Sequence, residues 1–166
     1  MHPHPKKLTK NHEMRFTPNI ETCIRRAGWF PGRQEPIEHE ILTWYPPNHP
    51  VFGVLTEFGQ LRILRSQHYT NEDYGGNVDI FGFSRVPEMV ANLRSVEGIL
   101  GKCLAFLGYV DAMEAIVMSD DKSILLSDGN NLCYWAPNFD DFLARVLVGN
   151  KRVPFPPEYT PGSWKW

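Results

Sequence analysis

The chain has little cysteine and no long apolar run. Its 166 residues include three cysteines, Cys23, Cys103 and Cys133, which are odd in number, far apart and free of any CxxC pair. This usage argues against a secreted disulfide framework, and we interpret the cysteines as buried thiols. No stretch approaches the roughly 18 uninterrupted apolar residues of a membrane span, and no apolar region follows the polar start of the chain. We therefore expect a soluble protein of a reducing, cytoplasmic compartment.

Sequence patterns of catalysis and of metal binding are also missing. The string GFSRV at 82–86 lacks the final glycine of a nucleophile elbow, and neither GxxxxGK[ST] nor GxGxxG occurs. His39 lies between Glu38 and Glu40, but no HExxH motif and no deaminase-type PCxxC accompanies it. The sequence therefore predicts a protein that is not an enzyme and that holds neither a metal nor a cofactor.

Length and composition suit one compact domain. At 42% hydrophobic and 13% aromatic residues, a chain of this size buries roughly 70% of its unfolded surface, which is enough for a core without disulfides or metal. Residues 1–15 have no hydrophobic period and are predicted to form a flexible basic arm. The domain is predicted over 16–152, and a tail rich in proline and tryptophan over 153–166.

The net charge of −2 is unevenly distributed. Residues 1–35 carry seven lysines and arginines against three acids, whereas residues 111–150 carry two against seven. A nucleic-acid-binding domain normally has a basic, aromatic folded part, so direct nucleic-acid binding is not expected. The acidic second half favours a basic partner, or serves solubility alone.

Hydrophobic periodicity and turn residues divide the chain into an α+β pattern. Apolar spacing predicts helices at 18–26, 37–45 and 48–57, with one or two more within 87–105, broken around Gly98 or Gly101. Alternating or apolar runs predict strands at 61–65, 78–83, 104–110, 115–118, 124–127 and 132–135. A closing helix is predicted after the N-cap Asn138 and ends at Gly149. The expected fold is α+β, with N-terminal helices, a mainly antiparallel sheet and a closing C-terminal helix packed on it.

The most specific local pattern is AGWFPGR, from Ala27 to Arg33. Thr17 is a good N-cap for the preceding helix, Pro18 suits its first position, and Gly28 can end it with a positive φ. The central residues Pro31-Gly32 are typical of a type II turn.

Two interpretations of the aromatic and cationic residues in this turn are open. Trp29 and Phe30 can fold back on the helix, with Arg33 stacked on the indole or paired to a carboxylate. Alternatively, Trp29 and Arg33 are exposed for a partner, as in many binding hot spots. Their position directly after a helix end favours the structural interpretation.

These residues carry a resemblance to a known family. The helix followed by Ala27, Gly28, Trp29, Gly32 and Arg33 is similar to the "AGW-x-x-GR" opening of the SUKH superfamily, and of its third group of bacterial immunity proteins in particular. A second landmark of that group, "FGGL", appears as Phe58-Gly59-Gln60-Leu61, with Gln60 in place of the second glycine. The resemblance covers roughly Thr17 to Lys151, and a glutamine at this point leaves the backbone less free.

The resemblance implies a cytoplasmic binding protein of a polymorphic toxin system that neutralises a cognate toxin, frequently a nuclease or a nucleic-acid deaminase. An alternative is a SUKH-type regulatory or scaffolding module that binds a partner without a toxin. From charge alone, we expect a basic partner to meet the acids at the predicted turns and at the start of the closing helix, namely Asp120, Asp121, Asp128, Asp140 and Asp141. Taken singly, the pair Asp120-Asp121 in a turn and the pair Asp140-Asp141 at a helix start are more readily explained as solvated charges than as functional groups.

Overall fold

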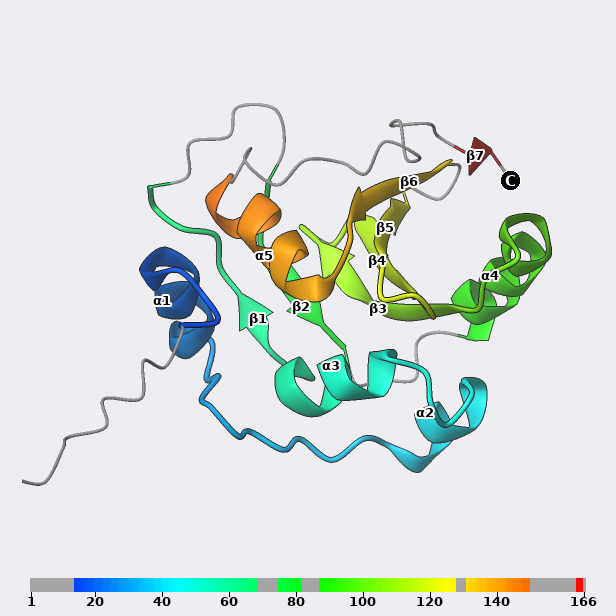
Figure 1. Ribbon diagram of the computed structural model, residues 1–166, viewed down its shortest axis with the longest axis horizontal. Helices are drawn as coiled ribbons and strands as arrows, with labels where there is room; N and C mark the ends of the chain where they lie inside the picture. The colour runs from blue at the N-terminus through cyan, green and yellow to red at the C-terminus, as the bar shows by residue number, and fades with distance from the viewer. Residues whose placement is uncertain (1–13, 69–74, 82–86, 128–130, 150–163, 166) are drawn as a thin grey trace, which may run out of the picture.

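The fold is described from a computed structural model, which places residues 14–68, 75–81, 87–127, 131–149 and 164–165 (Figure 1). Within these residues the chain forms helices and strands in an α+β order. The elements are α1 (Pro18–Arg26), α2 (His39–Trp44), α3 (Val51–Phe58), β1 (Arg62–Ile63), β2 (Val78–Ile80), α4 (Pro87–Leu100), β3 (Leu104–Val110), β4 (Glu114–Ser119), β5 (Ile124–Ser127), β6 (Asn131–Ala136), α5 (Phe139–Val148) and β7 (Trp164–Lys165).

The strands of the described residues form one antiparallel meander in chain order, from β1 at one edge to β7 at the other. The β3–β4 hairpin has a three-residue loop between the paired Val110 and Glu114, and its turn is centred on Asp111-Ala112, where φ is +48° and +58°, as the central positions of a type I′ turn require. Because Leu104 pairs with Ser119 and Ile124 pairs with Ala136, the α4–β3 junction, the β4–β5 turn and the start of α5 all lie at the same end of the sheet.

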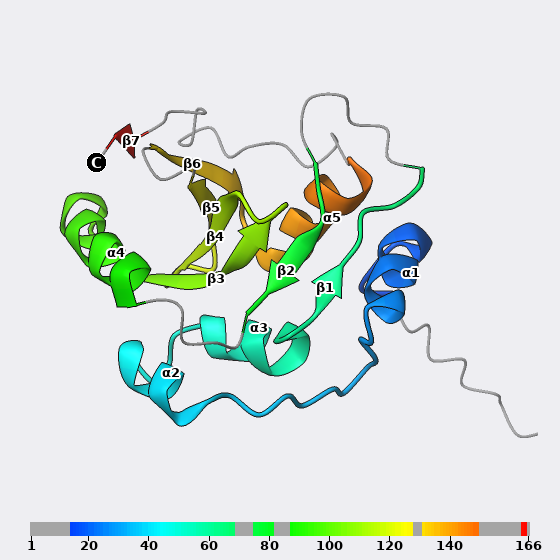
Figure 2. The same ribbon diagram turned by 180° about the vertical axis from the view of Figure 1, so that it is seen from behind.

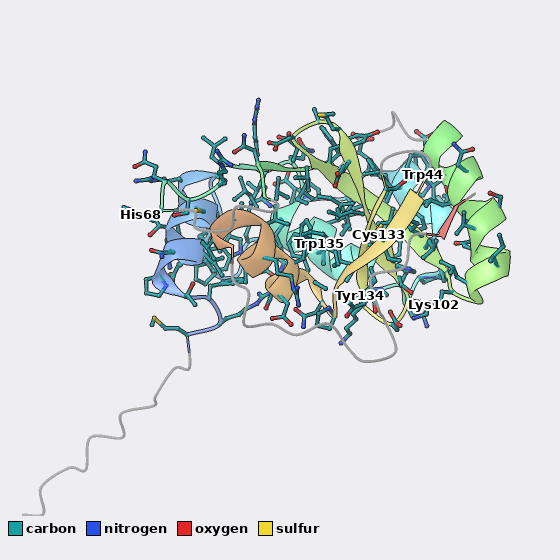
Figure 3. All side chains as sticks on the ribbon, turned by 90° about the horizontal axis from the view of Figure 1, so that it is seen from above. Trp44, His68, Lys102, Cys133, Tyr134 and Trp135 are labelled. Atoms are coloured by element: carbon teal, nitrogen blue, oxygen red, sulfur yellow. The ribbon has the colours of Figure 1, made fainter. Side chains whose placement is uncertain are left out.

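Each face of the sheet has its own apolar layer. Side chains alternate along β4, so that Ile116 and Met118 belong to the larger core with α1, α3 and α5, while Ala115 and Val117 face the side of α4. Figure 2 shows the same arrangement from behind, with α1 and α5 at one end of the molecule and α4 at the other. In Figure 3, Cys133, Tyr134 and Trp135 follow β6 between α5 and α4.

The closing helix α5 has the ends that its sequence predicts. The Asn138 side chain accepts a hydrogen bond from the backbone N–H of Asp141 at 2.9 Å, and Gly149 adopts the left-handed conformation with φ +69°. The bond to Asn138, and the bond from the Gly149 N–H to the Arg145 carbonyl at 3.1 Å, satisfy backbone groups that a helix end otherwise leaves unpaired. Its apolar side, which includes Phe142 and Leu143, is fully buried.

The predicted fold class is confirmed, with corrections at element boundaries. Helix α4 is continuous through Gly98 and ends at Leu100, because Gly101 takes the positive φ of +64° that stops a helix. Helix α3 begins at Val51, three residues later than predicted, since Pro50 occupies its N-cap. Strands β1 and β2 are shorter than predicted, and the expected extension of β2 to 83 lies beyond the described residues.

Candidate functional site

The AGWFPGR turn is a packed junction. Gly28 has a φ of +102°, and the backbone N–H of Trp29 donates to the Ile24 carbonyl at 3.0 Å, which folds the chain back against α1. The Trp29 ring is 7% exposed and stacks on Phe58 at a centroid distance of 6.2 Å. Its indole N–H donates to Glu57 Oε1 at 3.0 Å. The structural interpretation of Trp29 is therefore confirmed.

Arg33 closes the C-terminal end of α3. Its side chain is only 10% exposed, and its Nη1 donates to the Glu57 carbonyl at 2.9 Å. Its Nη2 donates to the Gly59 carbonyl at 2.9 Å and to Glu35 Oε2 at 2.7 Å. A cation at the C-terminal end of a helix is favourable because the last carbonyls carry partial negative charge. Of the two expected roles, pairing to a carboxylate holds, while Arg25 is the cation over the Trp29 ring, at 5.6 Å.

One expectation for this turn is wrong. Phe30 does not fold back on α1, because 54% of its surface is exposed. The turn that follows is the predicted one, since Gly32 has a φ of +81° and the Arg33 N–H donates to the Phe30 carbonyl at 3.1 Å. The turn therefore presents a large apolar side chain to the surface.

Close packing accounts for most residues of the Phe58-Gly59-Gln60-Leu61 motif. A Cβ on Gly59 would lie 2.3 Å from the Leu55 carbonyl oxygen, so no larger residue fits without displacing backbone. Gln60 adopts a φ of +64°, the left-handed conformation that glycine takes without strain. Phe58 and Leu61 are buried in the main core. The two family motifs are thus one unit, joined by the Trp29–Phe58 stack and by Arg33 at Gly59.

Arg15 joins α3 to the start of α5. Its guanidinium binds Asp140 through Nε and Nη2 at 2.7 and 2.8 Å, and binds both carboxylate oxygens of Glu57 through Nη1 at 2.6 and 2.9 Å. These partners, above all Asp140, raise the pKa of Arg15. The sequence places Arg15 in the flexible arm, whereas the structure holds it against the domain and over the Phe16 ring.

An open groove of about 370 Å³ lies between this turn and α3. Its walls include Gly32 and Arg33 on one side and Phe52, Gly53 and Glu57 on the other. The chain from the turn to α2 runs past α3 in both Figure 1 and Figure 2, and the Glu35 N–H donates to the Thr56 carbonyl at 2.7 Å. The groove is therefore built by the same contacts that join the two motifs.

Asp120 and Asp121 occupy the β4–β5 turn, at the end of the sheet beside α4. Asp120 Oδ2 accepts from the backbone N–H of Cys103 at 3.3 Å. Asp121 is paired with Lys102, which Figure 3 shows at the α4 side of the molecule, and accepts from the Ser123 N–H at 3.0 Å. Burial alone would raise the pKa of Asp121, but the bonds from Lys102 and Ser123 outweigh it and lower the pKa to about 2. Both acids therefore organise the turn.

Asp140 and Asp141 lie in the first turn of α5. Asp140 is shared with Arg15, as above, and Asp141 Oδ2 accepts from the Asn138 side chain at 2.9 Å. Asp128 lies outside the described residues. The structure thus links Asp140 to Glu57 through Arg15, places Asp141 beside the N-cap Asn138 and places Asp120 and Asp121 at the β4–β5 turn, and whether any of them meets a partner stays a prediction.

His49 lies in a polar cluster at the end of the sheet that carries the α4–β3 junction and the β4–β5 turn. Its Nδ1 accepts from the Val51 N–H at 3.1 Å, so the ring proton is on Nε2, which is 3.3 Å from the Cys103 carbonyl. Burial lowers the pKa of His49, against the opposing influence of Asp120 and Glu97. Burial also raises the pKa of the Cys103 thiol, which keeps it a poor nucleophile.

Among the side chains that the structure places, no three His, Cys, Asp or Glu residues are grouped so that they could hold a metal ion. In the same part of the chain, no helix has the length and apolar character needed to cross a membrane.

The fold and the joined motifs define a class of protein, a single α+β domain in which a helix–turn signature is bound to the end of α3. Within that class the chain belongs to the SUKH-3 immunity protein family, whose family model matches residues 16–149. No curated protein and no solved structure matched the chain.

Sequence reasoning missed two features of this region. Arg15 was assigned to the arm because its partners, Glu57 and Asp140, are 42 and 125 residues away. In the sequence Gly53 looks like any other residue of a short apolar helix, and only the structure shows that it lines the groove. The charge pattern gave a signal for an acidic surface in this region, since residues 34–59 contain four glutamates and neither lysine nor arginine.

Proposed function

We propose that this protein is an immunity protein that binds a cognate bacterial toxin in the cytoplasm and neutralises it by contact, without catalysis. The observation that carries the proposal is the match to the SUKH-3 immunity protein family over residues 16–149. The match spans both motifs and the closing helix, so it concerns the whole folded domain and not a local pattern.

The chemistry of the surface favours a nuclease or a nucleic-acid deaminase as the toxin. Such an enzyme presents basic groups to phosphates, and an acidic inhibitor can occupy the same groups and associate rapidly through electrostatic steering. Residues 111–150 carry seven acids against two basic residues, and residues 34–59 carry four against none. A basic partner is therefore better matched than an acidic one.

The test of this function is rescue from toxicity. The protein encoded by the adjacent gene, as the candidate toxin, is expressed in a host that lacks both genes, with and without this protein. We expect growth only when the protein is present, together with a stable complex of the purified protein and a catalytically inactive form of the same toxin. Failure to restore growth, with both proteins soluble, would contradict the proposal and favour a regulatory module that binds another partner.

The five predicted aspartates are tested on the same complex. Replacing Asp120, Asp121, Asp128, Asp140 and Asp141 by asparagine is expected to weaken toxin binding and to reduce its salt dependence. Asparagine keeps the size of each side chain, and thermal unfolding of the variant separates lost binding from the lost Lys102 and Arg15 ion pairs. Unchanged affinity at low salt would exclude this set as the binding surface.

A further inference from the structure

Gly53, in the α3 wall of the groove, is a glycine that the packing of the fold does not require. Gly53 is in the middle of α3, where glycine is less favourable than alanine because it loses more backbone freedom on folding. A Cβ built on Gly53 would have no atom within 4 Å, so no packing contact requires glycine there. Gly32 on the opposite wall is equally open. Both walls therefore leave room for atoms from another molecule to approach the backbone.

Apolar side chains lie beside Gly53 and Gly32. Phe30 projects from the same turn as Gly32 and is one of the large apolar side chains that the fold leaves exposed. Phe52, which lines the groove, is half-buried. Exposed aromatic side chains beside a hollow are typical anchors of protein–protein interfaces.

The charged side chains around the groove form a paired network with a small excess of acids. Arg33 is the cation in its wall, and its guanidinium is already bound to Glu35 and to the last carbonyls of α3. Glu35 and Glu57 each keep about a quarter of their side-chain surface exposed, at 28% and 24%. Through Arg15, Glu57 is linked to Asp140 at the start of α5, so the cluster holds three acids, Glu35, Glu57 and Asp140, against two arginines and has a net charge of −1.

We propose that this groove, between the AGWFPGR turn and α3, is the docking surface for the toxin, and that its occupant is a basic loop of that toxin. The loop lies over Gly53, packs an apolar side chain against Phe30 and Phe52, and directs a lysine or arginine to Glu57 and Glu35. The inference rests on the proposed function for the partner, and it adds to the predicted aspartates a contact on the face of the sheet that α1, α3 and α5 cover.

The experiment uses one substitution at two matched positions. Gly53→Arg fills the groove and adds a positive charge, while Gly98→Arg makes the same change in α4 on the other face of the sheet. Gly98 is also an exposed glycine inside a helix, with no atom within 4 Å of a built Cβ. Arginine favours helix more than glycine does, so both variants are expected to fold at least as stably as the original chain.

Affinity is measured by titration with the catalytically inactive toxin encoded beside this gene. We expect Gly53→Arg to weaken binding at least about tenfold, with a slower association at low salt, and Gly98→Arg to change it less than about twofold. Equal binding by Gly53→Arg, or an equal loss in both variants, overturns the groove as the docking surface. If the original chain does not bind this toxin, the proposed function itself is wrong.

Discussion

Arg33 should contribute more to stability than any exposed arginine of this chain. Removing it by Arg33→Ala leaves the Glu57 and Gly59 carbonyls without their donors at the end of α3. Each of these two hydrogen bonds from a charged donor contributes about 1.5 kcal/mol, and the ion pair with Glu35, whose side chain is 28% exposed, adds about 0.5 kcal/mol. The expected loss is therefore about 3.5 kcal/mol, or a Tm decrease of roughly 7–14 °C for a chain of this size.

The matched control is Arg62→Ala. Arg62 is 73% exposed and has one ion pair, to Asp79 at 3.5 Å. An exposed pair of this kind contributes below about 0.5 kcal/mol. Arg33→Lys keeps the charge but lacks the planar fork that serves separate acceptors, so it should lose about half of the Arg33→Ala effect.

The assay is urea unfolding followed by tryptophan fluorescence and by circular dichroism. The slope against urea should be unchanged, so that the midpoint reports the free energy of unfolding. If Arg33→Ala and Arg62→Ala differ by less than about 0.5 kcal/mol, then Arg33 does not close α3 in the way described. The link that Arg33 makes between the two motifs at Gly59 would then be refuted as well.

Two further predictions concern stability. Gln60→Gly should raise the free energy of unfolding by about 0.5 kcal/mol in urea, because it relieves about 1 kcal/mol of left-handed strain and returns part of it as unfolded-state entropy; a decrease would contradict this. Between pH 7 and pH 5 the protein should lose stability, because the pKa of His49 is lowered in the folded state and the unfolded chain, with a pKa of about 6.5, takes up the proton first. The contribution is complete above that range, and His49→Gln should flatten the dependence; an equal slope in both proteins would refute the assignment.

Elements whose ends depend on neighbouring residues could be predicted from the sequence. Helix α5 is the clearest case, because its Asn138 cap and its left-handed Gly149 act on backbone within four residues. The meander from β3 to β6 follows from apolar runs divided by turn residues. Helix α4 was less well defined, since Gly98 and Gly101 look alike in sequence and only one of them takes a positive φ.

The candidate site was less predictable because its contacts are long-range. The charge pattern pointed to acids of the second half, but the partners of Asp121 and Asp140, Lys102 and Arg15, are far away in sequence. A charge that is already paired and one that is available look the same along the chain. The groove depends on two walls that are about twenty residues apart, and no local pattern describes the space between them.

The sequence alone carried the resemblance to the family in its two motifs. It also determined the α+β class and the turn at Ala27–Arg33, because helix capping, positive φ and hydrophobic periodicity act between near neighbours. Only the tertiary structure decided what that turn is for. It brought Trp29 onto Phe58 and Arg33 onto the end of α3, 26 residues further along at Gly59. It also left Phe30 exposed and Gly53 uncovered, since exposure depends on how distant elements pack.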